Sequence, residues 1–361
     1  MDMTPPATAS TPARSPEAIR AEREAFYARI GQDNLAPLWE QLHNLVTKTP
    51  TSACVPAHWS YDQVRAYITE ATDLITAQEA ERRVLILENP GLRGKAAITT
   101  SLYAGLQCIL PGEVARAHRH SQSALRLILE GDGAYTSVNG EKTIMRRGDF
   151  VTTPSWTFHD HGNDSDKPMV WLDGLDVQLV AALDASFAES SNDDQQALQR
   201  PVGDSVLRYG NGLAPVDWTP APNKASPLFC YPYARTRESL FGMQAGGQPD
   251  PCLGYKLRYI DPLTGGAPMP TMGAYAQLLP RGMTTLPYQC SSGTVFAVLE
   301  GEVDVQVNDT RFTAVPNDVF VIPSWAAHTF SVRDDAVLFS FSDRPVQEAL
   351  ALYRENRSGR V

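Results

Sequence analysis

Short apolar segments separated by turns dominate the chain from residue 96 onward. Apolar and polar positions alternate in Ala96–Leu110, Ala124–Gly133 and Ala134–Met145, and Asn139 and Gly140 interrupt the last of these. Alternation with a period of two predicts half-buried β-strands, and Asn-Gly between two strands predicts a tight hairpin. Several strands separated by about 8–12 residues predict a sandwich or a barrel.

The first 95 residues follow a different pattern. Residues 15–30 place Ile19 and Phe26 on one face of a predicted helix, with Ser15 as its N-cap and Pro16 at its first position. Two further helices are predicted over residues 37–46 and 61–75. We expect a flexible tail over 1–14, which is rich in Pro, Thr, Ala and Ser, and a helical cover or dimerisation arm over 15–95.

The β-rich pattern occurs twice. Residues 278–330 repeat the order of residues 109–161: Gly112 and Gly131 recur as Gly282 and Gly301, and each Pro-Ser-Trp is followed three residues later by a histidine. Self-similarity of this kind indicates an internal repeat. We therefore expect one barrel over 96–180, a connector over 181–268, a second barrel over 269–345 and a C-terminal helix over 346–361.

Histidines concentrate in the first repeat. His118 and His120 are one residue apart, so a strand directs both to the same face, and a closed barrel would bring His159 opposite them. Three imidazoles with open coordination positions suit Zn, Cu, Fe or Ni. Arg126 falls on the same face, and no acid nearby in the sequence balances its charge. Because a buried cation requires an anion, we expect an anionic ligand.

Composition and charge limit the possible functions. The net charge of −10 argues against a binder of duplex nucleic acid, and no apolar run approaches the roughly 20 residues of a membrane span. The N-terminus lacks the apolar segment of a secretory signal. Five widely spaced cysteines without a CxxC pair argue against a disulfide framework or a zinc ribbon. A cytoplasmic protein with reduced thiols is expected.

The spacing of these residues resembles the motifs of the cupin superfamily. The first cupin motif, G-x5-H-x-H-x3-4-E-x6-G, is matched by Gly112, His118, His120, Ala124 and Gly131. The second, G-x5-P-x-G-x2-H-x3-N, is matched by Gly148, Pro154, Trp156, His159 and Asn163. Two positions depart from the motifs: Ala124 replaces a glutamate ligand and Trp156 replaces a glycine. The resemblance thus implies three histidine ligands without a carboxylate, which disfavours isomerase-type and oxalate-type sites.

The second repeat keeps only one of the three histidines. Tyr288 and Cys290 stand at the first two positions and His328 at the third. Because tyrosine and cysteine can also ligate iron, two interpretations stay open for this barrel: a second metal site, or a structural barrel without metal.

A closer resemblance extends over nearly the whole chain. It is to the bicupin ring-cleaving dioxygenases of gentisate, salicylate and 1-hydroxy-2-naphthoate, and it is carried by Arg82–Gly94, Tyr103–Gln107, His118–Gly131, Gly148–Asn163 and Trp171–Asp176. The resemblance implies a mainly β, bicupin fold, Fe(II), consumption of O2, an aromatic hydroxy-acid substrate, and a homotetramer.

The same resemblance implies roles for individual residues. It assigns His118, His120 and His159 to the metal, and directs Arg82 and Arg126 to the carboxylate and ring oxygens of the substrate. It places the remaining site residues in the pocket: His161, Asp173, Tyr103, Gly105 and Gln107. His161 and Arg126 are the expected catalytic residues. Without the resemblance, Arg82 is equally consistent with a surface ion pair and Asp173 with a turn.

The expected reaction is cleavage of gentisate (2,5-dihydroxybenzoate) by O2 to maleylpyruvate, in aromatic compound catabolism. Two alternatives stay open: a salicylate or 1-hydroxy-2-naphthoate 1,2-dioxygenase, and a non-catalytic bicupin that binds small acids. Tyr103 and Gly105 are the residues expected to choose among ring substrates.

Overall fold

The computed structural model describes residues 14–357, so the tail expected over 1–14 lies outside the described residues except for Arg14. Residues 14–49 and residues 50–357 belong to two separate compact units. Within residues 14–357, no helix combines the length and the apolar character that crossing a membrane requires.

The N-terminal unit contains the two helices α1 (Pro16–Gln32) and α2 (Leu38–Leu45). As predicted, the Ser15 hydroxyl accepts a hydrogen bond from the Ala18 backbone N–H (3.1 Å) and so caps α1. The Tyr27 hydroxyl ties the helices together, because it donates to the Glu40 carboxylate (2.6 Å) and accepts from the Trp39 indole N–H (2.7 Å).

The second unit contains two β-barrels, each made of two sheets. In the first barrel, a six-stranded sheet in the order β12-β8-β5-β10-β3-β2 accompanies a five-stranded sheet in the order β11-β4-β9-β6-β7. Its strands are β2 (Val84–Ile86), β3 (Tyr103–Ile109), β4 (Val114–His120), β5 (Ala124–Glu130), β6 (Asp132–Val138), β7 (Glu141–Arg146), β8 (Phe150–Thr153), β9 (His159–Asn163), β10 (Met169–Leu175), β11 (Ala188–Ser190) and β12 (Cys230–Tyr231).

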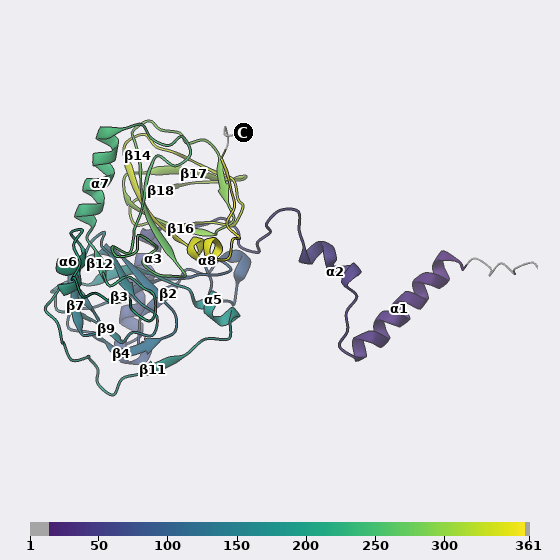
Figure 1. The fold of residues 1–361 in the computed structure, drawn as a ribbon, viewed down its shortest axis with the longest axis horizontal. Coiled ribbons are helices and arrows are strands. Elements are labelled where there is room, and N and C mark those ends of the chain that lie inside the picture. Colours follow the sequence, from purple (N-terminus) through teal and green to yellow (C-terminus); the bar gives the residue numbers. More distant parts are fainter. Residues whose placement is uncertain (1–13, 358–361) are drawn as a thin grey trace, which may run out of the picture. The chain divides into compact units, whose positions relative to one another are not determined.

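The second barrel repeats this strand order. Its sheets run β1-β19-β16-β21-β14-β13 and β18-β17-β20-β15-β22, which confirms the predicted repeat and the bicupin fold (Figure 1). Its strands are β1 (Ala57–Trp59), β13 (Tyr255–Arg258), β14 (Gly273–Leu279), β15 (Tyr288–Cys290), β16 (Thr294–Glu300), β17 (Val303–Val307), β18 (Thr310–Ala314), β19 (Val319–Ile322), β20 (His328–Ser331), β21 (Ala336–Ser342) and β22 (Glu355–Arg357).

Segments outside the predicted barrels supply edge strands to both. Strand β1, from the region expected to be helical, pairs with β19 of the second barrel, whereas β2 pairs with β3 of the first. The expected connector supplies β11 and β12 to the first barrel and β13 to the second. These strands have two to four residues, too few for alternation to reveal them in the sequence.

The remaining helices are short apart from two. They are α3 (Tyr61–Leu74), α4 (Ala77–Ala80), α5 (Val177–Ala182), α6 (Asp204–Tyr209), α7 (Tyr233–Gly246) and α8 (Arg344–Ala349), with a 3-10 turn at Pro90–Leu92. The C-terminal helix ends at Ala349, and the chain continues into β22, which pairs with β15.

The two barrels share one apolar core. Buried side chains of the first barrel, such as Leu125 and Leu172, join those of the second, such as Phe339 and Phe341, in a single cluster. The contact is close, because a Cβ added to Gly174 would lie 2.7 Å from the Phe341 ring. The barrels therefore pack as parts of one structure.

Backbone conformation explains two features of the sequence. Asn139 (φ 49°) and Gly140 (φ 76°) both have positive φ, and they connect β6 to β7 as the predicted hairpin turn. Trp156 (φ 56°) and its counterpart Trp325 (φ 62°) are also left-handed. This conformation accounts for the glycine that the cupin motif places where Trp156 stands.

Candidate active site

Three histidine rings converge inside the first barrel. His118 and His120 come from β4, and His159 begins β9, directly opposite His118 in the antiparallel pair. Their ring centroids lie 4.1–5.4 Å apart, and one nitrogen of each lies within 4.8 Å of the others. The structure thus brings together the three residues that the spacing predicted.

Hydrogen bonds orient each ring. The Nδ1 atoms of His118, His120 and His159 bond to the backbone carbonyls of Arg116 (2.9 Å), Gln122 (2.8 Å) and Thr157 (2.9 Å). Because a carbonyl only accepts, Nδ1 carries the proton and Nε2 is left with a lone pair. The His159 Nε2 atom is buried without a hydrogen-bond partner among the described residues. Such an arrangement fits a bound metal ion.

Burial keeps these rings neutral. It lowers the pKa of His118 to about 3, assisted by the Arg82 charge, and that of His120 to about 4. It also lowers the pKa of the buried His159 well below the ordinary value. Neutral imidazole is the form that binds metal ions, and three neutral ligands would leave the charge of a divalent ion uncompensated.

The other sheet of the barrel contributes a row of residues on three adjacent strands. Asp173 of β10 pairs with Gly105 of β3 on one side and with Arg126 of β5 on the other. The Arg126 Nε atom lies 3.3 Å from Asp173 Oδ1, and both side chains are buried. No acid near Arg126 in the sequence balances its charge, but Asp173 does so in the fold. Its counter-ion comes from a strand far along the chain, which sequence proximity could not reveal.

The two charges respond differently to burial. Burial raises the pKa of Asp173 to about 6, although Arg126 and Arg82 act in the opposite direction. Burial also lowers the pKa of Arg126 to about 10, so the guanidinium stays charged near neutral pH. Asp173 additionally accepts a hydrogen bond from the Trp171 indole N–H (3.0 Å).

His161 lies next to the three histidines without joining them. Its Nε2 accepts a hydrogen bond from Arg126 Nη2 (2.9 Å), and its Nδ1 bonds to the Thr136 hydroxyl (2.9 Å). Burial, followed by the charge of Arg126, lowers its pKa well below the ordinary value. His161 is therefore neutral, and Arg126 connects it to Asp173 on the other sheet.

Arg82 reaches the same pocket from the end of α4. Its guanidinium contacts the ring nitrogens of His118, and burial lowers its pKa. Arg82 and His118 line a cavity of about 290 Å³ together with His120, Glu189 and Ser190. Arg82 therefore lies at the site and not in a surface ion pair.

Strand β3 closes the other side of the site. Tyr103, Gly105 and Gln107 alternate along it and so share one face. A Cβ at Gly105 would lie 2.7 Å from the Tyr103 hydroxyl and 2.6 Å from Val84 Cγ1. The glycine therefore leaves the space that the Tyr103 hydroxyl needs.

Three further residues, which the sequence pattern did not single out, support the site. Thr153 accepts a hydrogen bond from Arg126 Nη1 (2.6 Å), Thr136 bonds to His161, and Trp171 bonds to Asp173. Alternation could have identified one of them, because Trp171 lies two residues before Asp173 on the same face of β10.

The corresponding place in the second barrel has different partners. The Tyr288 hydroxyl donates to Glu355 (2.8 Å), and Cys290 Sγ contacts the Ser292 hydroxyl (3.4 Å). Across residues 14–357, His118, His120 and His159 form the one group of three His, Cys, Asp or Glu side chains close enough to hold a metal.

Comparisons with known proteins agree with this geometry. A family model described as a cupin domain matches residues 105–175 and 275–341. Gentisate 1,2 dioxygenase 1 of Aquipseudomonas alcaligenes is 52% identical over 94% of this chain and 98% of its own length. A gentisate 1,2-dioxygenase of Streptomyces sp. is 37% identical over 96% of this chain and 99% of its own.

A solved structure gives the same result. Salicylate 1,2-dioxygenase from Pseudoaminobacter salicylatoxidans, crystallised as an adduct with gentisate, superposes with a TM-score of 0.88 at 34% identity, over 98% of this chain and 97% of that one. This chain therefore belongs to the bicupin ring-cleaving dioxygenases of the gentisate and salicylate 1,2-dioxygenase family.

Proposed function

We propose that this dioxygenase uses Fe(II) and O2 to cleave gentisate to maleylpyruvate. One observation carries the proposal: three neutral imidazoles face a buried arginine across the interior of a barrel. The relatives from Aquipseudomonas alcaligenes and Streptomyces sp. are both named gentisate dioxygenases, which supports this choice of substrate.

His118, His120 and His159 would hold the metal through their Nε2 atoms. When bound, Fe(II) would supply a path for electrons between the aromatic ring and O2. The direct reaction of O2 with the ring, without a metal, is spin-forbidden. The backbone carbonyls of Arg116, Gln122 and Thr157 fix the ring orientations, so the rings themselves need little rearrangement to accept the ion. The Arg82 guanidinium, which contacts Nε2 of His118 in the structure, would have to move aside.

Charge in the pocket favours an anionic substrate. Arg82 and Arg126 contribute two positive charges, which Asp173 balances only in part. We assign the substrate carboxylate to these guanidinium groups, whose planar donors match carboxylate oxygens. Fixing the carboxylate in this way would also fix the orientation of the ring beside the histidines.

His161 is the proposed proton acceptor. Its Nε2 accepts from Arg126 in the structure, and a substrate carboxylate that draws the guanidinium toward itself would free this lone pair for a ring hydroxyl. Thr136 holds the opposite nitrogen and keeps the free lone pair on the pocket side. His161 would then act as a general base or as an acceptor that orients the hydroxyl.

Tyr103 favours gentisate over salicylate. No hydrogen bond of its hydroxyl is found with the described residues, and the hydroxyl lies at the Gly105 side of the pocket. Gentisate has a second ring hydroxyl and salicylate lacks it. The Tyr103 hydroxyl could form a hydrogen bond with this second hydroxyl of gentisate, whereas salicylate offers it no such partner.

An oxygen electrode tests the proposal directly. The enzyme loaded anaerobically with Fe(II) is mixed with gentisate in air-saturated buffer, and we expect one O2 to be consumed per gentisate. Salicylate and 1-hydroxy-2-naphthoate are run in parallel with ultraviolet detection of ring loss. Oxygen uptake with either of these but not with gentisate would contradict the substrate, and no uptake with any of them would contradict the reaction.

We also propose a homotetramer in the cytoplasm. The five cysteines are free and four of them are buried, which agrees with a reducing compartment. Light scattering on the purified enzyme measures the assembly, and a mass other than four chains would contradict it.

A further inference from the structure

The second barrel contains a cavity of its own, with a volume of about 210 Å³. Tyr288, Cys290 and His328, which stand where the first barrel has its metal-site histidines, line this cavity. Because both barrels have the same strand order, the duplication has kept a cavity but changed its chemistry.

Several positions that are polar in one barrel are apolar in the other, and the reverse. Phe296 and Phe330 stand at the repeat positions of Arg126 and His161, so the second barrel has apolar aromatic rings where the first has a cation and a polar imidazole. Conversely, Lys256 of the second barrel occupies the position that Val84 has in the first. Lys256 lies opposite Gln277 on the neighbouring strand, as Val84 lies opposite Gln107. The second cavity thus has its own cation, at a place where the first barrel is apolar.

Lys256 has no counter-ion within residues 14–357. Its ammonium group lines the cavity and lies 5.2 Å from the centre of the Tyr275 ring and 5.6 Å from that of Phe296. Burial lowers its pKa to about 8. Aromatic faces compensate a cation only in part, so an anion entering the cavity would gain a charge-assisted contact.

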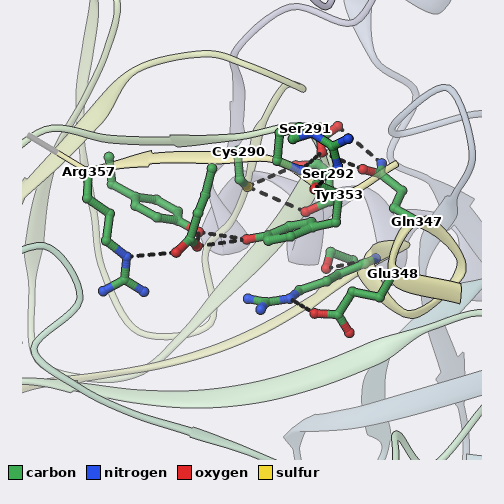
Figure 2. A network of polar contacts seen from close by, with 12 residues as sticks. Cys290, Ser291, Ser292, Gln347, Glu348, Tyr353 and Arg357 are labelled. Carbon is green, nitrogen blue, oxygen red and sulfur yellow. Dashed lines mark hydrogen bonds and ion pairs between the residues drawn. The ribbon is translucent and has the colours of Figure 1, made fainter. Parts of the chain in front are cut away.

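The acids around the cavity are already engaged elsewhere. Glu348 pairs with Arg344 (2.7 Å), and Glu355 pairs with Arg357 (2.9 Å) and accepts from the Tyr288 hydroxyl (2.8 Å). Figure 2 shows this network, with Tyr353 beside Cys290 and between Arg357 and Glu348. Arg344, whose charge Glu348 compensates, lies over the Tyr353 ring at 4.1 Å and lines the cavity wall.

We propose that this cavity binds a small organic carboxylate, with its anionic group on Lys256 and a compact apolar body against Phe296, Ile322 and Ala326. The site is separate from the three-histidine site and needs no metal. Its ligand class is set by the combination of one uncompensated cation, Lys256, and an apolar floor.

Benzoate is a suitable probe, because it combines a carboxylate with a compact ring. Equilibrium dialysis of the Fe(II)-loaded enzyme under anaerobic conditions counts the benzoate bound per chain. We expect the wild type to bind one more benzoate per chain than Lys256→Met. Lys256→Arg keeps the charge and should keep this additional binding, and Lys95→Met, at an exposed position, should match the wild type.

Cys290 locates the binding event. It lines the cavity and is the least buried of the five cysteines, so benzoate should slow its alkylation by about tenfold or more in the wild type but not in Lys256→Met. Butyrate serves as the aliphatic counterpart: protection by either acid supports the site, and the stronger protector identifies the ligand body.

Two results would overturn the proposal. One is equal benzoate stoichiometry in the wild type and Lys256→Met together with unprotected Cys290. The other is equal protection by benzamide, which has the same ring without the negative charge. Neither result depends on the cleavage activity of the first barrel.

Discussion

Asp173 and Arg126 lie directly opposite each other on adjacent strands and form a buried ion pair, with Arg126 Nε 3.3 Å from Asp173 Oδ1. Arg126 also donates to His161, whose β-strand begins with His159. The pair therefore links the sheet that would bind the substrate carboxylate with the sheet that would hold the metal.

His159→Ala should abolish iron binding and O2 uptake, because it removes the buried Nε2 that the other two rings face. His328→Ala is the matched control, since His328 occupies the repeat position in the second barrel. Metal analysis after Fe(II) loading should give no iron for the first variant and the wild-type content for the second. Wild-type iron content in both variants would rule out the proposed site.

Arg126→Ala should raise KM and lower kcat for gentisate. A charge-assisted hydrogen bond is worth about 1.5–3 kcal/mol, so kcat/KM should fall by roughly tenfold to more than a hundredfold. Steady-state oxygen consumption measures both constants, with Arg333→Ala on the exposed surface as the control. Kinetics equal to the wild type would remove Arg126 from the carboxylate contact.

Asp173 should make the protein less stable as the pH rises from about 4 to 6. Its native pKa of about 6 lies above the ordinary value of 3.8, so between these values the native state binds more protons than the unfolded chain, and stability falls as pH rises. Asp173→Asn removes this dependence. Between about pH 4 and 6, the free energy of unfolding of the wild type should fall by about 3 kcal/mol relative to that of the variant, because each unit of difference in pKa corresponds to about 1.36 kcal/mol.

Urea unfolding of both proteins at several pH values between 4 and 7 measures this difference. Asp176, whose pKa burial also raises to about 6, is present in both proteins and cancels from the comparison. A constant difference in unfolding free energy at every pH would show that Asp173 titrates normally.

Tyr103→Phe should lower kcat/KM for gentisate by roughly tenfold, as expected for the loss of one hydrogen bond to a ring hydroxyl. Turnover of salicylate, if the enzyme accepts it, should change little because salicylate lacks that hydroxyl. Measuring kcat/KM for both acids with the wild type and with Tyr103→Phe gives the change in preference. An equal loss for both acids would assign Tyr103 to packing instead of selection.

Gly174→Ala should destabilise the protein by about 1–3 kcal/mol, because the added Cβ would lie 2.7 Å from the Phe341 ring and 3.0 Å from Leu125 Cδ1. Thermal unfolding measures the loss. Gly212→Ala, where no atom lies within 4 Å but φ is 73°, separates the cost of backbone strain from that of overpacking.

The histidine group was predictable because its members obey local rules. His118 and His120 share a strand face by alternation, and His159 follows a Pro-Ser-Trp turn that occurs twice. The helix at Ser15 and the hairpin at Asn139 were predictable for the same reason: their capping and turn residues act within a few positions.

The charge balance of the site was not predictable, because it depends on which strands become neighbours. Asp173 and Arg126 are adjacent only because β10 lies between β3 and β5. The edge strands were hidden for a related reason. Ala57–Trp59 forms a strand by pairing with β19. Three residues are too few to show a periodic pattern in the sequence.

Strand β1 also has a consequence for how the protein is made. Ala57 is synthesised long before its partner Val321, which lies far along the chain. At about 5–20 residues per second, synthesis of the intervening segment takes roughly 13–50 s. During that interval β1 has no partner strand, so this edge of the second barrel can form only after β19 has been synthesised.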